Sequence, residues 1–296
     1  MKLGETKLVK LDKLCKLYDI NCVVYAKDES TNPSGSIKDR PAYMMVKKFK
    51  EEGLLSDGGT IIEATSGNMG ISLAFFQKEL NYHAIIVMPS SMSLERRKKI
   101  QDLGAKLILV DGGMKQCNDK VKELKEQNPG YVLLKQFENP NNPLSHYLGT
   151  GPEIVADLED LDYLFAGMGT GGTISGIGNF FKDNNIKAKV IGVEPFESPL
   201  LTSGQAGPHL IQGIGANFVP AILDLNVIDE IVTCKGQDAI NMSKQIKVVE
   251  GISVGYSAGA ALKACFDYIK NNKLENKKMV VVFPDKGDRY SEWYVQ

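Results

Sequence analysis

Residues 163–178 read YLFAGMGTGGTISGIG, a stretch that passes from a short apolar strand through glycines into a helix. Five small residues, Gly169 to Thr173, lie at the junction. Backbone N–H groups at a helix N-terminus point outward and suit an anion, and small residues let a phosphate approach them closely. The hydroxyl groups of Thr170 and Thr173 would add donors. We therefore expect a phosphate site in a strand–loop–helix unit of an α/β fold.

The same stretch satisfies the pattern GxGxxG with Gly167, Gly169 and Gly172. Glu194 ends the next apolar run, roughly where a dinucleotide-binding fold places the acid that binds ribose. A nicotinamide-dependent dehydrogenase is therefore one interpretation. The glycines indicate a phosphate more strongly than they indicate which cofactor carries it.

Strand-like and helix-like runs alternate along almost the whole chain. Continuous apolar strands between amphipathic helices predict βαβ units and buried, mainly parallel sheets flanked by helices. The runs form two groups, which predicts two α/β lobes, and residues 138–143, ENPNNP, are the candidate linker. The predicted strands are residues 22–27, 60–65, 84–89, 106–111, 163–169, 189–194 and 279–285.

A second candidate anion loop lies in residues 63–76, EATSGNMGISLAFF, where an apolar strand again leads directly into a helix. Small residues between the two would leave backbone N–H groups available for an anion. Alternatively, Ser66 or Asn68 would only cap the helix. The sequence leaves both interpretations open.

Lys38 lies in a loop of turn-forming residues, NPSGSIKDRP at 32–41, immediately before a predicted helix. A single lysine is usually a solvated surface charge. A lysine at a loop–helix junction can instead be directed into a binding site. Together with a phosphate site and a second anion loop, Lys38 indicates a pyridoxal 5'-phosphate enzyme. The lysine amine would hold the cofactor aldehyde as a Schiff base, and the second loop would hold the substrate carboxylate.

The composition argues against several classes of protein. The 296 residues are 43% hydrophobic and 24% charged, with a formal net charge of -1, so nucleic acid is not an expected partner. No apolar run is long enough for a membrane helix and no signal-peptide core is present, so no membrane association is expected. Five scattered cysteines and three histidines predict neither a disulfide framework nor a metal site, and favour a reducing cytoplasm.

Six motifs, in this order, resemble the cysteine synthase (O-acetylserine sulfhydrylase) and cystathionine β-synthase family of fold-type II pyridoxal-phosphate enzymes. The resemblance covers approximately residues 4–291, and the sequences of the motifs are most similar to those of B-type cysteine synthases. It implies a smaller lobe of residues 35–145, a larger lobe of residues 1–34 and 146–296 that includes the first strands, and the cofactor in the cleft between them. It also implies a homodimer and, as a possible partner, serine acetyltransferase. The motifs are SIKDR, TSGNMG, GMGTGGT, IQGIGANFVP, EGISVGYSAGA and PDKGDRYS.

The resemblance assigns roles to individual residues. Lys38 would be the Schiff-base lysine, Asn68 would contact the cofactor's 3-hydroxyl group, and Ser257 would meet the pyridine nitrogen. Because a serine hydroxyl is neutral, loss of a β-substituent would compete well with transamination. The phosphate would be bound by Gly169, Thr170, Gly171, Gly172 and Thr173. The substrate would be bound by Thr65, Ser66, the backbone at Met69, Gln136, and Gly213 to Gly215.

The implied reaction is a β-replacement on a small amino acid, with O-acetylserine and sulfide giving cysteine and acetate. Two departures bear on the substrate: Met69 replaces a threonine of the family's usual TSGNTG loop, and Asn217 replaces a glycine. Methionine can accept sulfur-bearing groups. A sulfide-releasing β-replacement or β-elimination on cysteine, forming serine, lanthionine or cystathionine, therefore stays an alternative. A catalytically inactive binding homologue is a further one.

Overall fold

The computed structural model describes residues 2–65 and 67–288. The chain divides into two compact units: unit 1 comprises Met1–Ile37 and Pro143–Gln296, and unit 2 comprises Lys38–Asn142. Each unit contains a mainly parallel sheet flanked by helices, so the predicted α/β fold class is confirmed.

Unit 1 is built on a six-stranded sheet with the order β1-β2-β9-β6-β7-β8. β1 pairs antiparallel with β2, and the other neighbours are parallel. The carboxyl ends of β6, β7 and β9 therefore lie at one edge, where the loops that follow them can meet. The strands are β1 (Leu8–Lys10), β2 (Val23–Asp28), β6 (Tyr163–Gly167), β7 (Lys189–Pro195), β8 (Glu230–Cys234) and β9 (Lys278–Phe283).

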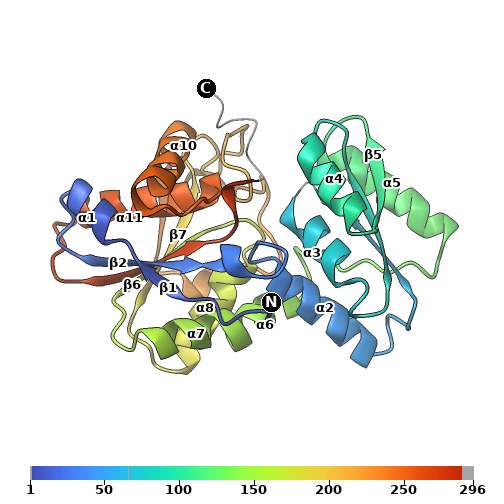
Figure 1. Ribbon diagram of the computed structural model, residues 1–296, viewed down its shortest axis with the longest axis horizontal. Helices are drawn as coiled ribbons and strands as arrows, with labels where there is room; N and C mark the ends of the chain where they lie inside the picture. The colour runs from blue at the N-terminus through green and yellow to red at the C-terminus, as the bar shows by residue number, and fades with distance from the viewer. Residues whose placement is uncertain (1, 66, 289–296) are drawn as a thin grey trace. The chain divides into compact units, whose positions relative to one another are not determined.

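Helices cover both faces of this sheet (Figure 1). α1 (Asp12–Leu17), α10 (Gly236–Gln245) and α11 (Tyr256–Asn271) pack on one face, and α7 (Gly151–Asp157) and α8 (Gly172–Asp183) on the other. The sequence of β6 is apolar throughout because both faces of the strand are buried. Phe165 packs into the core on one face, and its neighbours Leu164 and Ala166 pack into the core on the other. The remaining helical segments are α6 (Asn141–Ser145), α9 (Leu200–Ser203), η1 (Glu29–Thr31), η2 (His146–Thr150), η3 (Leu225–Val227) and η4 (Ile246–Glu250).

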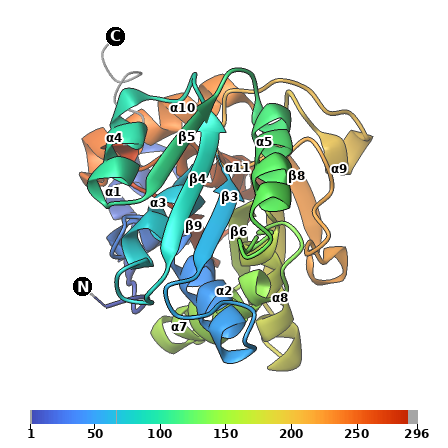
Figure 2. The same cartoon turned by 90° about the vertical axis from the view of Figure 1, so that its right-hand side faces the viewer.

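Unit 2 has a three-stranded parallel sheet, β3 (Thr60–Ala64), β4 (His83–Pro89) and β5 (Lys106–Val110), in that order. The free edge of β3 is extended by one parallel bridge from Val132 to Ile61. Figure 2 shows this sheet with α5 (Met114–Gln127) on one face. α2 (Asp39–Glu51), α3 (Asn68–Phe76) and α4 (Leu94–Asp102) pack on the other face.

All seven predicted strands are present, each within two residues of its expected ends. β8 was not predicted, because its residues are only partly buried and give a weak apolar signal. Within the described residues, no helix is both long and apolar enough to cross a membrane. All five cysteines are buried and unpaired.

Candidate active site

The loop between β6 and α8 in unit 1 can only be built from glycine at two positions. A Cβ atom on Gly169 would lie 2.2 Å from the carbonyl oxygen of Gly213, which is far closer than van der Waals contact. Gly171 has φ +82, in the left-handed region that side chains disfavour. The loop is therefore a close-fitting backbone cradle at the N-terminus of a twelve-residue helix.

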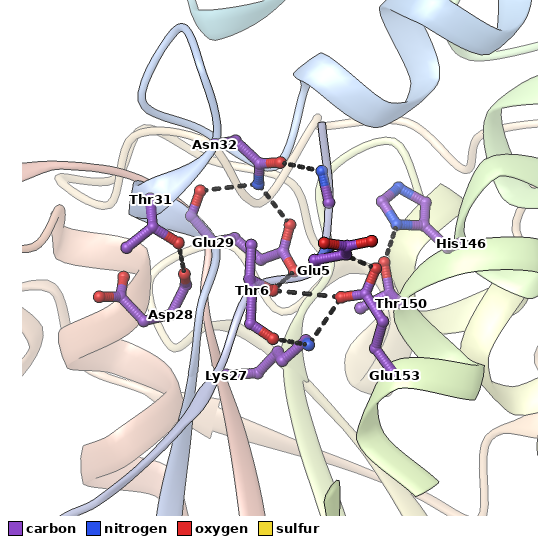
Figure 3. A network of polar contacts seen from close by, with 11 residues as sticks. Glu5, Thr6, Lys27, Asp28, Glu29, Thr31, Asn32, His146, Thr150 and Glu153 are labelled. Atoms are coloured by element: carbon purple, nitrogen blue, oxygen red, sulfur yellow. Dashed lines mark hydrogen bonds and ion pairs between the residues drawn. The ribbon is translucent and has the colours of Figure 1, made fainter. Parts of the chain in front are cut away.

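Two threonines add hydroxyl groups to this cradle. Thr170 is 6% exposed, and its Oγ1 accepts a hydrogen bond from the Gly172 N–H at 3.3 Å. Nδ1 of His146, a fully buried residue, lies 2.9 Å from Thr150 Oγ1 (Figure 3). Nε2 of the same ring lies 3.3 Å from Thr173 Oγ1. His146 was not predicted as a site residue, because its contact with Thr173 spans 27 residues and depends on how α8 packs.

The predicted Gly213–Gly215 segment and Ser257 lie beside the same cradle. The N–H of Gly215 donates to Met168 O at 2.9 Å, which joins the segment to the loop after β6. A Cβ atom on Gly213 would lie 3.8 Å from Ser257 Oγ, so the segment also lies close to the first turn of α11. Unit 1 therefore brings together predicted cofactor and substrate residues from three distant parts of the chain.

Glu194 has a structural role instead of the ribose-binding role that a dehydrogenase would require. The side chain is 2% exposed. Its carboxylate accepts hydrogen bonds from Leu201 N–H (2.9 Å), Thr202 N–H (3.0 Å) and Thr202 Oγ1 (2.6 Å). These bonds hold the start of α9, and the carboxylate is already occupied by them.

Lys38 immediately precedes α2 in unit 2 and is partly buried. The next residue, Asp39, is fully buried and accepts a 2.6 Å hydrogen bond from Ser72 Oγ on α3. This bond ties the start of α2 to α3, so the helix that follows Lys38 is fixed to the helix that begins with Asn68.

The segment leading to Lys38 is anchored in unit 1 by a buried polar network (Figure 3). Lys27, fully buried, pairs with Glu153 at 2.8 Å. Glu29 accepts hydrogen bonds from Thr6 Oγ1 at 2.7 Å and from Asn32 Nδ2 at 2.7 Å. Lys27 Nζ also donates a hydrogen bond to Thr6 O, so the buried ammonium group has both an ion pair and a further hydrogen bond, as a buried charge requires.

The second predicted anion loop follows β3. Thr65 is buried, and its Oγ1 accepts a hydrogen bond from Gly67 N–H at 3.2 Å. Gly67 is the N-cap of α3 and Asn68 its first residue, so Asn68 does not cap the helix. Ser66, also predicted to bind substrate, lies outside the described residues. Met69 is 1% exposed, and its side chain belongs to the apolar core of unit 2.

Gln136 is buried in a segment that leaves the edge of β3 four residues after the Val132–Ile61 bridge. Asn142 Nδ2 donates to Gln136 O at 2.7 Å. The Val132–Ile61 bridge places this segment beside the end of β3, where Glu63 is a buried carboxylate that the sequence did not suggest. Burial raises the pKa of Glu63 to about 7.

The donors present suit the expected cofactor. Two hydroxyl groups and the N-terminal N–H groups of α8 provide hydrogen bonds and a positive dipole end, which fit a phosphate dianion. A residue with a side chain would not fit at position 169, because its Cβ atom would collide with the Gly213 carbonyl oxygen. Within residues 2–65 and 67–288, no cluster of three or more His, Cys, Asp or Glu side chains could hold a metal ion.

Comparison with known proteins gives the family. The family of pyridoxal-phosphate dependent enzymes matches residues 1–285. Cysteine synthase B of Campylobacter jejuni is 45% identical over 97% of this chain and 94% of its own. The crystal structure of a hydrogen sulfide-producing enzyme from Fusobacterium nucleatum has a TM-score of 0.93 at 42% identity, covering 97% of this chain and 95% of its own. That of cysteine synthase from Entamoeba histolytica has a TM-score of 0.93 at 37% identity, covering 98% and 87%.

The chain therefore belongs to the family of pyridoxal-phosphate dependent enzymes, and pyridoxal 5'-phosphate is its cofactor. The family expected from the six sequence motifs is confirmed.

Proposed function

We propose that the protein is a cysteine synthase, which converts O-acetylserine and sulfide to cysteine and acetate. The observation that carries this proposal is the 45% identity to Campylobacter jejuni cysteine synthase B over nearly the full length of both chains. The glycine cradle of unit 1 and the proximity of Gly213 to Ser257 support the same function, because they bring predicted cofactor and substrate residues together.

We propose that Lys38, Asn68, the 169–173 loop and Ser257 bind the cofactor. When bound, pyridoxal phosphate withdraws electrons from the α-carbon of the amino acid, so that the α-proton and the β-substituent can leave. Lys38 Nζ holds the cofactor at rest, accepts the α-proton during the reaction and returns it at the end. Asn68 orients the cofactor ring through its 3-hydroxyl group.

The remaining residues divide between the phosphate, the ring nitrogen and the substrate. Thr170, Thr173 and the backbone of the loop hold the phosphate. Ser257 offers the ring nitrogen a neutral hydroxyl group, which does not keep that nitrogen protonated as an aspartate would. The substrate carboxylate is held by Thr65, Ser66, the N–H of Met69 and Gln136, while Gly213 to Gly215 leave room for the substrate.

A second candidate function is release of sulfide from cysteine by β-replacement or β-elimination. The observation that favours it is the 42% identity and 0.93 TM-score to the hydrogen sulfide-producing enzyme of Fusobacterium nucleatum. The same proton transfers by Lys38 serve both directions, because each begins with loss of the α-proton and a β-substituent.

We further propose that the enzyme is a homodimer in the cytoplasm, with serine acetyltransferase as a possible partner. Family resemblance is the basis for the dimer and the partner. The cytoplasmic assignment is supported by five buried, unpaired cysteines, which suit a reducing compartment.

The test is a steady-state comparison of purified enzyme on two substrate pairs. Cysteine formation from O-acetylserine and sulfide is measured beside sulfide release from cysteine, with water, a second cysteine or homocysteine as the acceptor. Lys38→Ala is the control for cofactor-dependent turnover. We expect the first reaction to have the higher kcat/KM. Sulfide release with the higher kcat/KM would establish the second candidate instead.

A further inference from the structure

The 213–215 segment of unit 1, which the sequence predicts to line the substrate, has a backbone shape that only glycine adopts easily. Gly213 has φ +94 and Gly215 has φ +67, both in the left-handed region. Ile214 between them is 6% exposed and packs in the core of unit 1. Because glycine has more conformational freedom than any other residue, such a segment keeps one shape only where its neighbours hold it.

Two hydrogen bonds hold Gly215, one on each side of its Cα atom. Its N–H group donates to Met168 O at 2.9 Å, and its carbonyl oxygen lies 2.9 Å from Nε2 of His209. A carbonyl oxygen can only accept, so Nε2 carries a proton and donates it. The first bond restrains the φ angle of Gly215 and the second restrains its ψ angle.

The His209 ring packs directly against Gly215. A Cβ atom on Gly215 would lie 2.7 Å from His209 Nε2 and 2.7 Å from Pro195 Cγ. Nδ1 of His209 is buried, and no hydrogen-bond partner for it lies among the described residues. A buried nitrogen without a partner costs stability, which an apolar side chain of similar size would avoid. The bond to Gly215 is therefore the contact that accounts for a histidine here.

The backbone that carries His209 is anchored on its own account. Ile211, two residues further on, is fully buried in the core of unit 1. Leu210 packs against the start of α10, where a Cβ atom on Gly236 would lie 3.0 Å from Leu210 Cβ. A donor on an anchored backbone restrains its acceptor, whereas a donor on a loose loop would move with it.

We propose that His209 is a positioning residue: its Nε2–H group fixes the carbonyl of Gly215, so that the 213–215 segment keeps the shape in which it binds substrate. The inference rests on the proposed function, because it takes this segment as the substrate side of the site. The effect on the reaction passes through the backbone of Gly215, since the ring hydrogen-bonds that carbonyl.

The first measurement is the tautomer of His209 in apoprotein at about pH 8. The chain has only three histidines, so nitrogen NMR spectra of protein labelled with ¹⁵N in the imidazole rings contain few signals. The signal lost in a His209→Gln variant identifies the residue. We expect a proton on Nε2 and none on Nδ1. A ring that carries its proton on Nδ1 instead would overturn the proposal, because Nε2 could not donate.

Two substitutions at position 209 then test the effect on the site. His209→Leu has a similar volume and no donor, and we expect KM for the amino-acid substrate to rise about 10-fold while kcat stays within about three-fold. The cofactor absorbance should stay unchanged. In apoprotein, amide hydrogen exchange of peptides that contain residues 213–218 should accelerate about 10-fold. His209→Gln places an amide N–H group near the position of Nε2 and should restore most of both properties.

Tyr268→Phe is the control for general stability. It removes another hydrogen bond of unit 1, from Tyr268 OH to Glu230 at 2.9 Å, and should lower the urea midpoint without changing KM or the exchange of those peptides. The proposal is overturned if His209→Leu keeps the parent's KM and exchange, if His209→Gln is as impaired as His209→Leu, or if Tyr268→Phe raises KM as much.

Two of these measurements do not depend on the folding of His209→Leu. The tautomer in the parent and the kinetics of His209→Gln still decide the proposal if that variant fails to fold. Absence of cofactor or of turnover in the parent would overturn the proposed function, while the tautomer and the exchange rates of apoprotein would still test whether His209 holds Gly215.

Discussion

Replacing Met69 with threonine restores the residue that the family's usual TSGNTG loop has, and the structure predicts what this change does to stability. The Met69 side chain is 1% exposed and packs in the apolar core of unit 2 with residues such as Met45 and Ile100. Threonine is shorter and carries a hydroxyl group, so the change leaves a cavity and buries a polar atom. The expected loss in free energy of unfolding is about 2–4 kcal/mol.

The gain in catalysis should be small by comparison. A threonine hydroxyl bonded to a substrate carboxylate would contribute about 1.5–3 kcal/mol, or about 10–150-fold in kcat/KM. Because the side chain at position 69 lies in the core, we expect Met69→Thr to raise kcat/KM for O-acetylserine by less than about 10-fold. Met69→Leu is the matched control, since a swap that conserves volume should cost less than about 1.5 kcal/mol.

The measurements are urea titrations followed by circular dichroism, extrapolated linearly to water, together with steady-state kinetics on the same preparations. A Met69→Thr variant that unfolds like the parent while its kcat/KM rises about 10–150-fold would contradict this expectation. That result would place the side chain at position 69 in the substrate loop and not in the core.

Four further outcomes are expected. Borohydride should bleach the yellow protein and fix the cofactor on Lys38, whereas an unmodified Lys38 peptide in mass spectrometry would contradict the assignment. Gly169→Ala should weaken cofactor affinity more than about 10-fold in fluorescence titrations, because its Cβ would collide with the Gly213 carbonyl; unchanged affinity would mean that the phosphate binds elsewhere. Ser257→Asp should keep the cofactor but lose β-replacement and gain transamination, and normal β-replacement would show that Ser257 does not meet the ring nitrogen. Burial raises the pKa of Cys15 to about 11 and of Cys234 to about 12, so iodoacetamide should label both far more slowly in native than in unfolded protein, and equal rates would contradict this.

The strands and glycine loops were predictable because their signals are local. β6 and β7 are apolar on both faces because both of their faces are buried, and a fully buried strand has this sequence pattern in any context. The Gly169–Thr173 loop was equally predictable, because a strand, small residues and a helix follow each other directly. The cofactor class was predicted from three local motifs: the Gly169–Thr173 loop, the loop after β3 and the segment that contains Lys38. The lysine was the most informative of the three.

The residues that support these motifs were not predictable, because their partners are distant in the chain. His146 contacts Thr173 through the packing of η2 on α8, and Glu63 lies beside the segment after Val132 because of a strand pairing that spans seventy residues or so. A buried glutamate in an apolar strand is a visible anomaly in sequence, but its partners become visible only when the register of the sheet is known.

The structure also changes the interpretation of the two departures from the family pattern. Asn217, which replaces a glycine, has φ +62, a left-handed conformation that asparagine tolerates better than most side chains. Its Oδ1 accepts a 2.7 Å hydrogen bond from Ser198 Oγ, so the side chain is tied to a neighbouring loop. Met69 likewise fills the core of unit 2. Both substitutions preserve local structure without adding a group suited to a sulfur-bearing substrate. The sequence-based reason for keeping a cysteine-consuming reaction as an alternative is thereby weakened, which favours the proposed cysteine synthesis.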